Sequence, residues 1–389
     1  MADLVHLPSA DMGIILEVVA LTLYQFLYHP PRFDQLRRDK TRWQQFKELD
    51  FIGMFLFIAG FVLFIVGLSW GGQAYAWDSA EVVATLVVGA CTIVFFGIYE
   101  THICKGQPLM PPKIFTVGYT AIVACGSIGA MVYYTLTVIW PTIITSLYTT
   151  DVIEVGWKSA AVGGGILLGQ TIGGIALTYV PRIKYLTIVA SALGGGLTAS
   201  LAAVSPQHES AAIAQAILAC IFVGMVENIT LAGVTLVCED QDIGVAAGVL
   251  GSVRSMAGAI AQSLFLAIFT NKSTAYLQGS VPAAATDAGL SPDAVPAVFE
   301  GLTAGSFADV PGITPEIINA VGQAAQHAYS RAIYWTFIAA IPFAIILFIS
   351  SMFVPNVESM LTGNVAKKLQ GRGTKQAPES EESIGKEYS

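Results

Sequence analysis

Charged residues are scarce in this sequence. Asp, Glu, Lys and Arg together make up 12% of its 389 residues, about half the share found in a typical soluble domain. The five cysteines are Cys91, Cys104, Cys125, Cys220 and Cys238, and none of them is spaced as CxxC. The composition therefore argues against a soluble domain, and the cysteine spacing favours neither a disulfide framework nor a metal site.

Catalytic and nucleotide-binding motifs are also missing. The five histidines form no HxxxH pair, and the sequence contains no P-loop, no nucleophile elbow and no dinucleotide-binding fingerprint. An enzyme at a membrane would need His, Cys or carboxylate side chains clustered near an interface, and no such cluster occurs. The net charge of −8 gives no reason to expect a nucleic-acid partner. We therefore expect neither an enzyme nor a bound cofactor.

Long apolar segments dominate what is present. Hydrophobic residues make up 54% of the chain, and its mean hydropathy is +0.65. A bilayer core about 30 Å thick needs roughly 20 mostly apolar residues per helix. The first segment below is the weakest, because it is short and carries Glu17 and Gln25. The pattern predicts an all-α membrane protein with about nine transmembrane helices, at residues 12–28, 51–70, 81–99, 118–140, 159–180, 185–204, 211–237, 243–270 and 330–354.

Positive charge is confined to a few connections. Fifteen of the nineteen Lys and Arg residues lie in 29–50, 101–115, 181–184 and the C-terminal tail. By the positive-inside rule, these stretches face the cytoplasm and the lipid bilayer separates them from the other connections. The connection 238–242 falls on the same side although it is acidic. The connections expected outside are 71–80, 141–158, 205–210 and 271–329.

The connection 271–329 is the only long one expected outside. Gly, Pro and Ala dominate its first two-thirds, so we expect a loop with one short helix starting after Ser291. Thr314-Pro315-Glu316 then has the form of a helix N-cap followed by Pro at the first helical position. The domain organisation is therefore a doubtful first span (1–28), a cytoplasmic basic loop (29–50), two helices (51–99), a six-helix bundle (118–354) and a disordered cytoplasmic tail (355–389).

Glycines recur at helical spacing in two of the apolar segments. Small residues let helix backbones approach closely in lipid, where packing drives helix association. The glycines are explained by ordinary close packing, or by faces that slide against another bundle. The two sets are Gly165, Gly169 and Gly173, and Gly244, Gly248, Gly251 and Gly258, the second of which also includes Ser255 on the same face.

Two ionisable residues fall deep within the predicted spans. At 1.5 Å per residue, Glu227 and Arg254 both lie roughly 15 Å from the inner ends of their helices. The two helices are joined by a short connection, so they can be antiparallel neighbours with these charges at the same depth. Intramembrane charges are costly and are functional candidates by default. The alternatives are a self-satisfying ion pair and a role in handling a substrate or protons.

Two stretches resemble a known family. They are EDQDIGVAAGVLGSVRSMAGAIAQSLFLAIFTNK (239–272) and FLYHPPRF (26–33), the latter followed by a basic loop and LDFIGMFLFIAGFVLFIVGLSWGG (49–72). The chain is similar over about residues 24–370 to fourteen-span fungal drug-efflux proteins of the major facilitator superfamily. That branch contains trichothecene efflux pumps and siderophore-iron transporters. The resemblance implies a major facilitator-type helical bundle that comprises a partial sixth span, two central helices and the C-terminal six-helix half.

The resemblance also implies an activity. Members of this drug-efflux branch carry out secondary active, proton-coupled transport of small organic molecules such as toxins, drugs or siderophores. A multi-pass protein of the plasma membrane is expected, or alternatively of a vacuolar or vesicle membrane. Because the family's first half has no counterpart here, the alternative is a truncated, non-transporting fragment that associates with or regulates a complete transporter. A complementary transporter half is a further candidate partner.

The resemblance places a substrate cavity as well. In the family, the helices that match 118–140 and 211–237 line the cavity of this half. The candidates are therefore Tyr133, Tyr134 and Trp140 on the first helix, with Glu227 and Asn228 on the second. The aromatic residues suit bulky, partly apolar substrates, and equally suit packing or a position at the membrane interface.

Overall fold

The structure is a computed structural model. It describes residues 9–28 and 42–356 apart from 73, 105, 107, 181, 240–241, 305–306 and 308–309. These residues are mainly helical and include no β-strand. The chain divides into two compact units, residues 1–48 with 363–389, and residues 49–362. Most of the predicted basic loop and nearly all of the tail lie outside the described residues.

The first unit contributes two described helices, α1 (Ser9–Leu27) and α3 (Arg42–Glu48). The segment predicted as the first span is therefore helical. Its described apolar part, Ile14–Leu27, is nevertheless shorter than a spanning helix, which needs roughly 20 residues. The weakest of the nine predicted spans is thus the one that falls short.

The second unit contains eight helices that are long and apolar enough to cross a membrane. They overlap the last eight predicted segments, and several of them extend beyond the predicted bounds. The helix α5 (Ala80–Ile98) continues through a π-helical turn to Ile103. The helix α8 (Ile183–Ser200) continues through a 3-10 turn to Ala203. The last span combines α12 (Pro315–Ile338) with α13 (Ile341–Met352). The remaining five are α4 (Phe51–Trp70), α6 (Val117–Leu147), α7 (Val152–Tyr179), α9 (Glu209–Val237) and α10 (Ile243–Asp287).

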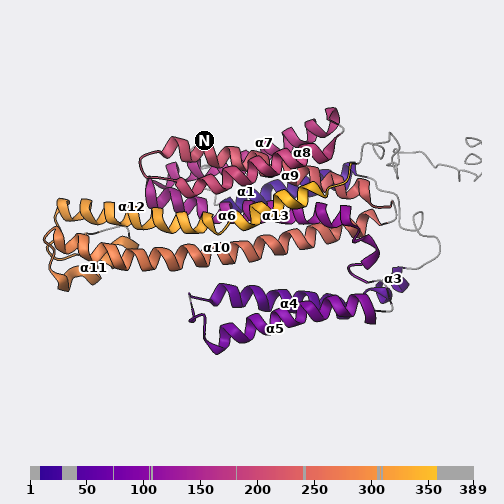
Figure 1. Ribbon diagram of the computed structural model, residues 1–389, viewed down its shortest axis with the longest axis horizontal. Coiled ribbons are helices and arrows are strands. Elements are labelled where there is room, and N and C mark those ends of the chain that lie inside the picture. Colours follow the sequence, from indigo (N-terminus) through magenta and orange to yellow (C-terminus); the bar gives the residue numbers. More distant parts are fainter. Residues whose placement is uncertain are drawn as a thin grey trace, which may run out of the picture. The chain divides into compact units, whose positions relative to one another are not determined.

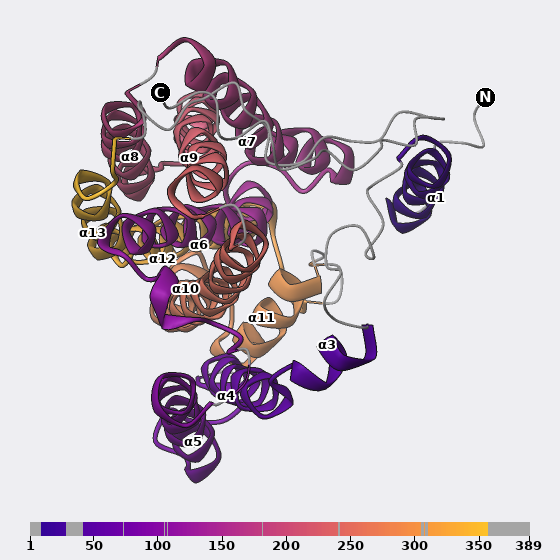
Figure 2. The same ribbon diagram turned by 90° about the vertical axis from the view of Figure 1, so that its right-hand side faces the viewer.

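The helices of the second unit pack as a bundle around α6 and α9, which are its most buried members. As Figures 1 and 2 show, α7 and α8 lie against α9, α10 lies against α6, and α13 lies against α8. The pair α4 and α5 forms a separate hairpin whose α4 contacts α10. In the first turns of both helices, the Tyr119 hydroxyl of α6 donates a hydrogen bond to the Ala246 carbonyl of α10 at 2.9 Å.

The glycines of α7 lie where that helix crosses α9. A Cβ atom added at Gly165 would lie 2.9 Å from the Ile217 carbonyl oxygen. One added at Gly169 would overlap the backbone of Ile221. Gly173 lies on the same face of α7, and a Cβ atom added there would lie 3.1 Å from the Met225 Cα atom. These three glycines therefore allow the two backbones to approach closely.

The glycines of α10 differ from one another. A Cβ atom at Gly258 would overlap the Tyr134 ring, so this glycine allows α10 to pack on α6. At Gly244, Gly248 and Gly251, no other heavy atom of the described residues lies within 4 Å of an added Cβ atom. Packing within the described part of the chain therefore does not explain these three.

The prediction of a loop directly after residue 270 is wrong. The helix α10 is 45 residues long and runs to Asp287, with Pro282 inside it. Val281 and Ala285, on either side of this proline, are fully buried in a second hydrophobic cluster. Burial of these side chains offsets the loss of one backbone hydrogen bond at proline and the low helix propensity of the segment.

Two other expectations for this connection are confirmed. A short helix, α11 (Val295–Ala304), follows Ser291 after one 3-10 turn. The Thr314 side chain caps α12 by accepting a hydrogen bond from the Ile317 amide at 3.3 Å, with Pro315 at the first helical position. We call residues 277–329 the cap. At one end of Figure 1, its helices extend beyond the others of the second unit, around their own hydrophobic cluster.

Candidate functional site

Glu227 lies in the middle of α9 with only 1% of its surface exposed. Its Oε1 atom is 2.6 Å from the Arg254 Nη2 atom of α10, which is the expected ion pair. Its Oε2 atom accepts a hydrogen bond from the Gln170 Nε2 atom of α7 at 3.1 Å. Both carboxylate oxygens therefore have a donor, as a buried charge requires.

A fourth helix completes the surroundings of this carboxylate. A Cβ atom added at Gly129 of α6 would lie 3.6 Å from the Glu227 Cγ atom. Gly129 of α6 therefore lies beside the Glu227 side chain, at the distance of an ordinary van der Waals contact. Helices α6, α7, α9 and α10 thus meet at Glu227, and a change in its charge or position affects its contacts with the other three helices.

Arg254 is less completely paired than Glu227. Its side chain is 21% exposed, whereas that of Glu227 is fully buried. The Arg254 Nε atom is buried and has no hydrogen-bond partner among the described residues. A guanidinium carries five N–H donors, so this side chain can donate to another acceptor while it holds Glu227. The site therefore combines a fixed acid with a partly accessible cation.

The other candidate residues are not part of this ion pair. Trp140 is fully buried, and its Nε1 atom donates to the Lys158 carbonyl at 3.2 Å, so in this structure it packs inside the bundle. The Tyr133 and Tyr134 rings lie 5.2 Å apart, and Tyr134 contacts α10 at Gly258. Asn228 packs against α7. None of these four is hydrogen-bonded to Glu227.

Charged contacts at the two ends of the bundle agree with the predicted sidedness. At one end, Lys113 Nζ lies 2.8 Å from Asp242 Oδ2, which joins two connections expected to be cytoplasmic. This contact gives the acidic connection 238–242 a positive partner, and the hydrogen bond from Lys113 to Asp242 raises the pKa of the lysine. The sidedness itself stays a prediction.

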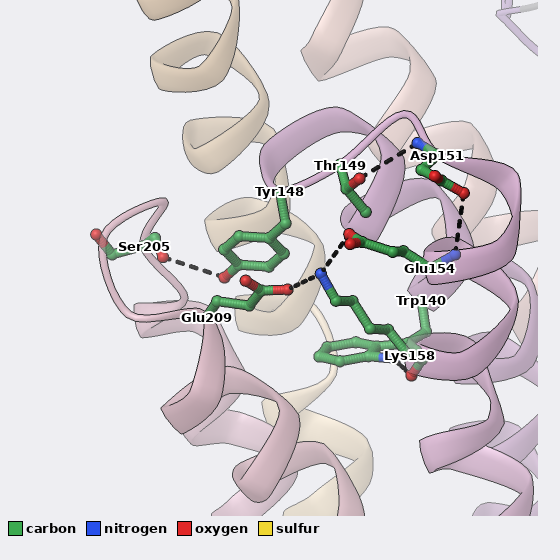
Figure 3. Close-up of polar contacts among 8 residues, drawn as sticks. All are labelled: Trp140, Tyr148, Thr149, Asp151, Glu154, Lys158, Ser205 and Glu209. Carbon is green, nitrogen blue, oxygen red and sulfur yellow. Dashed lines mark hydrogen bonds and ion pairs between the residues drawn. The ribbon is translucent and has the colours of Figure 1, made fainter.

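The other end carries a second charged contact. Lys158 Nζ lies 2.6 Å from Glu209 Oε1 and 3.1 Å from Glu154 Oε2, as Figure 3 shows. Two of the connections expected outside are therefore linked by one lysine. Because two carboxylates surround it, this lysine adds no net positive charge to the outer end.

The sequence interpretation missed two residues of interest. Gln170 was not recognised because an uncharged amide gives no signal of unusual cost within an apolar helix. Glu100 lies one residue beyond the predicted span 81–99, yet it is only 6% exposed. It accepts hydrogen bonds from the backbone amides of Leu109 at 3.0 Å and Met110 at 3.4 Å. A carboxylate directly after an apolar span was the signal available for it.

Comparison with known proteins gives the family. The model of the fungal trichothecene efflux pump family (TRI12) matches residues 11–382. The trichothecene efflux pump TRI12 of Fusarium sporotrichioides is 28% identical over 87% of this chain and 58% of its own length. The MFS-type transporter prx5 of Penicillium rubens is 30% identical over 82% of this chain and 59% of its own length.

Among solved structures, a bacterial homolog of the human lysosomal transporter Spinster gives a TM-score of 0.46 at 17% identity, over 78% of this chain and 64% of that chain. This chain spans slightly less than three fifths of the length of the two fungal relatives. The family match covers nearly all of it, and the helical membrane architecture agrees. The chain belongs to the fungal trichothecene efflux pump family of major facilitator transporters.

Proposed function

We propose that this chain contributes to a secondary active transporter that exports small organic molecules, with Glu227 as its proton-responsive group. The observation that carries this proposal is the buried contact of Glu227 with Arg254 and Gln170, at the junction of four helices. A transporter driven by protons needs an acid within the membrane whose charge state changes the preferred helix arrangement. Glu227 has the burial and the partners for this role.

The physical chemistry of coupling follows from those partners. When Glu227 is ionised, its charge holds Arg254 of α10 against α9. Protonation removes that charge, and Arg254 then needs another acceptor because a buried cation without a partner is costly. An oxygen atom of a bound substrate is such an acceptor, and the buried Nε donor, which has no partner among the described residues, supports the same use. Proton binding and substrate binding would thereby change the same contact.

The substrate class comes from the family. The Fusarium relative is named for trichothecenes, so we propose trichothecenes or chemically similar toxins as substrates, with siderophores as the second choice. Export from the cell implies a plasma-membrane location. Neutral, oxygen-rich ring systems suit a site that contains one ion pair and several aromatic side chains.

The test is an efflux assay in yeast. The part of the Fusarium pump that this chain does not match is fused to it, and cells are loaded with a radiolabelled trichothecene. Cells with the fusion should retain less toxin than vector cells, and an uncoupler that collapses the proton gradient should abolish the difference. Glu227→Gln should remove export at equal protein abundance. The control is Glu209→Gln, which makes the same change at a partly exposed position on α9.

Two results would contradict the proposal. Equal toxin retention in fusion and vector cells, at confirmed surface expression, would argue against export. Full export by Glu227→Gln would remove the proton role from this residue and leave the ion pair as a structural contact.

A further inference from the structure

A cleft lies between the end of α6 and the cap. Its volume is about 730 Å³, within the range of pockets that hold drug-sized molecules. The last turn of α6 and the residues after it form one wall, and α11 and α12 form the other. The lining includes Tyr148, Thr149, Leu302, Gly322, Gln326 and Tyr329. None of these residues contributes to the Glu227–Arg254 site.

The described lining mixes polar and apolar side chains and carries no charge. It combines the aromatic rings of Tyr148, Phe307 and Tyr329 with hydroxyl groups and one amide, and among the described residues it contains no Asp, Glu, Lys or Arg. An ion would lose its hydration there without a compensating charge, which is costly. A neutral molecule with ring faces and a few oxygen atoms would instead meet both apolar surface and hydrogen-bonding groups. The chemistry therefore selects uncharged ligands.

The walls of the cleft are fixed by contacts of their own. The Tyr148 hydroxyl donates to the Ser205 carbonyl at 3.1 Å, as Figure 3 shows, so this ring is anchored to the loop before α9. Gln326 Nε2 donates to the Leu147 carbonyl at 3.2 Å and joins α12 to the end of α6. Tyr329 stacks on Phe269 with ring centroids 6.3 Å apart. A site whose side chains are already ordered loses less entropy when it binds a ligand.

We propose that this cleft is a binding site for neutral, multi-ring organic molecules. It lies at the end of the bundle that the charge pattern predicts to face outward. It is separate from the ion pair within the membrane, and binding there requires neither transport nor a proton gradient. The proposal therefore goes beyond the proposed function and can be tested independently of it.

The two cap glycines Gly322 and Gly279 allow a matched test. Both lie in helices of the cap, and at both an added Cβ atom would have no other heavy atom of the described residues within 4 Å. Gly322 lines the cleft, whereas Gly279 is on the exposed face of α10 outside it. Gly322→Cys and Gly279→Cys therefore introduce the same thiol inside and outside the cleft.

The test measures alkylation of these thiols by N-ethylmaleimide in mild detergent, with mass spectrometry to separate them from the native cysteines. Saturating progesterone, a neutral four-ring probe, should slow alkylation of the thiol in Gly322→Cys at least about threefold, because it occupies the space beside that position. The thiol in Gly279→Cys should react at an unchanged rate. Pregnenolone sulfate, an anion with a similar ring system, should protect neither thiol.

A second pair of variants covers the case in which the introduced thiol reacts poorly. Gly322→Phe should weaken binding of radiolabelled progesterone in equilibrium dialysis at least about tenfold, since its ring occupies part of the cleft that the probe needs. Gly279→Phe should bind like the unmodified chain. Unchanged binding by Gly322→Phe, equal protection of both thiols, or equal protection by the anion would each overturn the proposal.

Discussion

Removing one partner of the Glu227–Arg254 ion pair is expected to destabilise the protein more than removing both. The perturbation is a double-mutant cycle with Glu227→Gln, Arg254→Gln and the two combined. Each single change leaves one charge without its counter-charge. The double change leaves two neutral amides that can hydrogen-bond with each other. The sign of the coupling energy between the two substitutions therefore tests whether the ion pair stabilises the protein.

The structure sets the magnitudes. Breaking a buried ion pair by removing one partner costs about 3–5 kcal/mol. Arg254→Gln strands a fully buried carboxylate, so its cost should lie at the upper end, although Gln170 still donates to Glu227. Glu227→Gln leaves an arginine that is 21% exposed. This substitution should therefore lower the free energy of unfolding by about 3 kcal/mol, the lower end of that range. Additivity would give roughly 8 kcal/mol for the double variant, whereas we expect about 2 kcal/mol.

The assay is reversible unfolding by sodium dodecyl sulfate in mixed micelles, followed by the fluorescence of the six tryptophans. The free energy of unfolding comes from the midpoint and the slope of the transition. Gln170→Ala is the control for a neutral neighbour, because it removes one uncharged donor and should cost about 1–2 kcal/mol.

A double effect equal to the sum of the two single effects within about 0.5 kcal/mol, the scatter expected for independent sites, would contradict the coupling. The coupling is also contradicted if Arg254→Gln costs no more than the Gln170→Ala control. In either case the two side chains are close without stabilising each other.

Three further predictions follow from the packing, the buried carboxylate and the charge pattern. Gly169→Ala should destabilise the chain by about 1–3 kcal/mol in the same unfolding assay, because the added methyl group meets the α9 backbone, whereas Gly164→Ala, with open space around it, should not. Glu100→Ala should cost about 1–3 kcal/mol, since two backbone amides lose their acceptor. In a cysteine-free background on intact cells, an impermeant maleimide should label the thiol of Asp293→Cys. It should label the thiol of Lys113→Cys only after the membrane is permeabilised. The reverse labelling pattern would mean the opposite topology.

The spanning helices could be predicted because a bilayer requires a fixed length of apolar chain. The segments for α4 and α9 follow directly from that length. What the hydropathy could not give was how far helices continue beyond the membrane. Residues 271–287 have a composition typical of a loop, and only the burial of Val281 and Ala285 in the cap explains their helical structure.

Part of the candidate site was also predictable. The depth of Glu227 and Arg254 on consecutive helices predicted their contact, because two charges at one level in lipid favour pairing. The Gln170 contact depends on how α7 rotates against α9, which the spacing of small residues indicates only in part. The cleft beside the cap could not be predicted, since it depends on the end of α6 meeting helices more than 150 residues later in the sequence.

The length of α10 has a mechanical consequence. Arg254 and Val281 belong to the same uninterrupted helix, and 27 residues at 1.5 Å per residue separate them by roughly 40 Å. A rigid rod of this length acts as a lever. A tilt of about 5° around Arg254 carries Val281 through roughly 3 Å, a displacement as large as a hydrogen bond is long. A rearrangement at the buried ion pair that tilts α10 therefore displaces the helix more at the cap than at Arg254 itself.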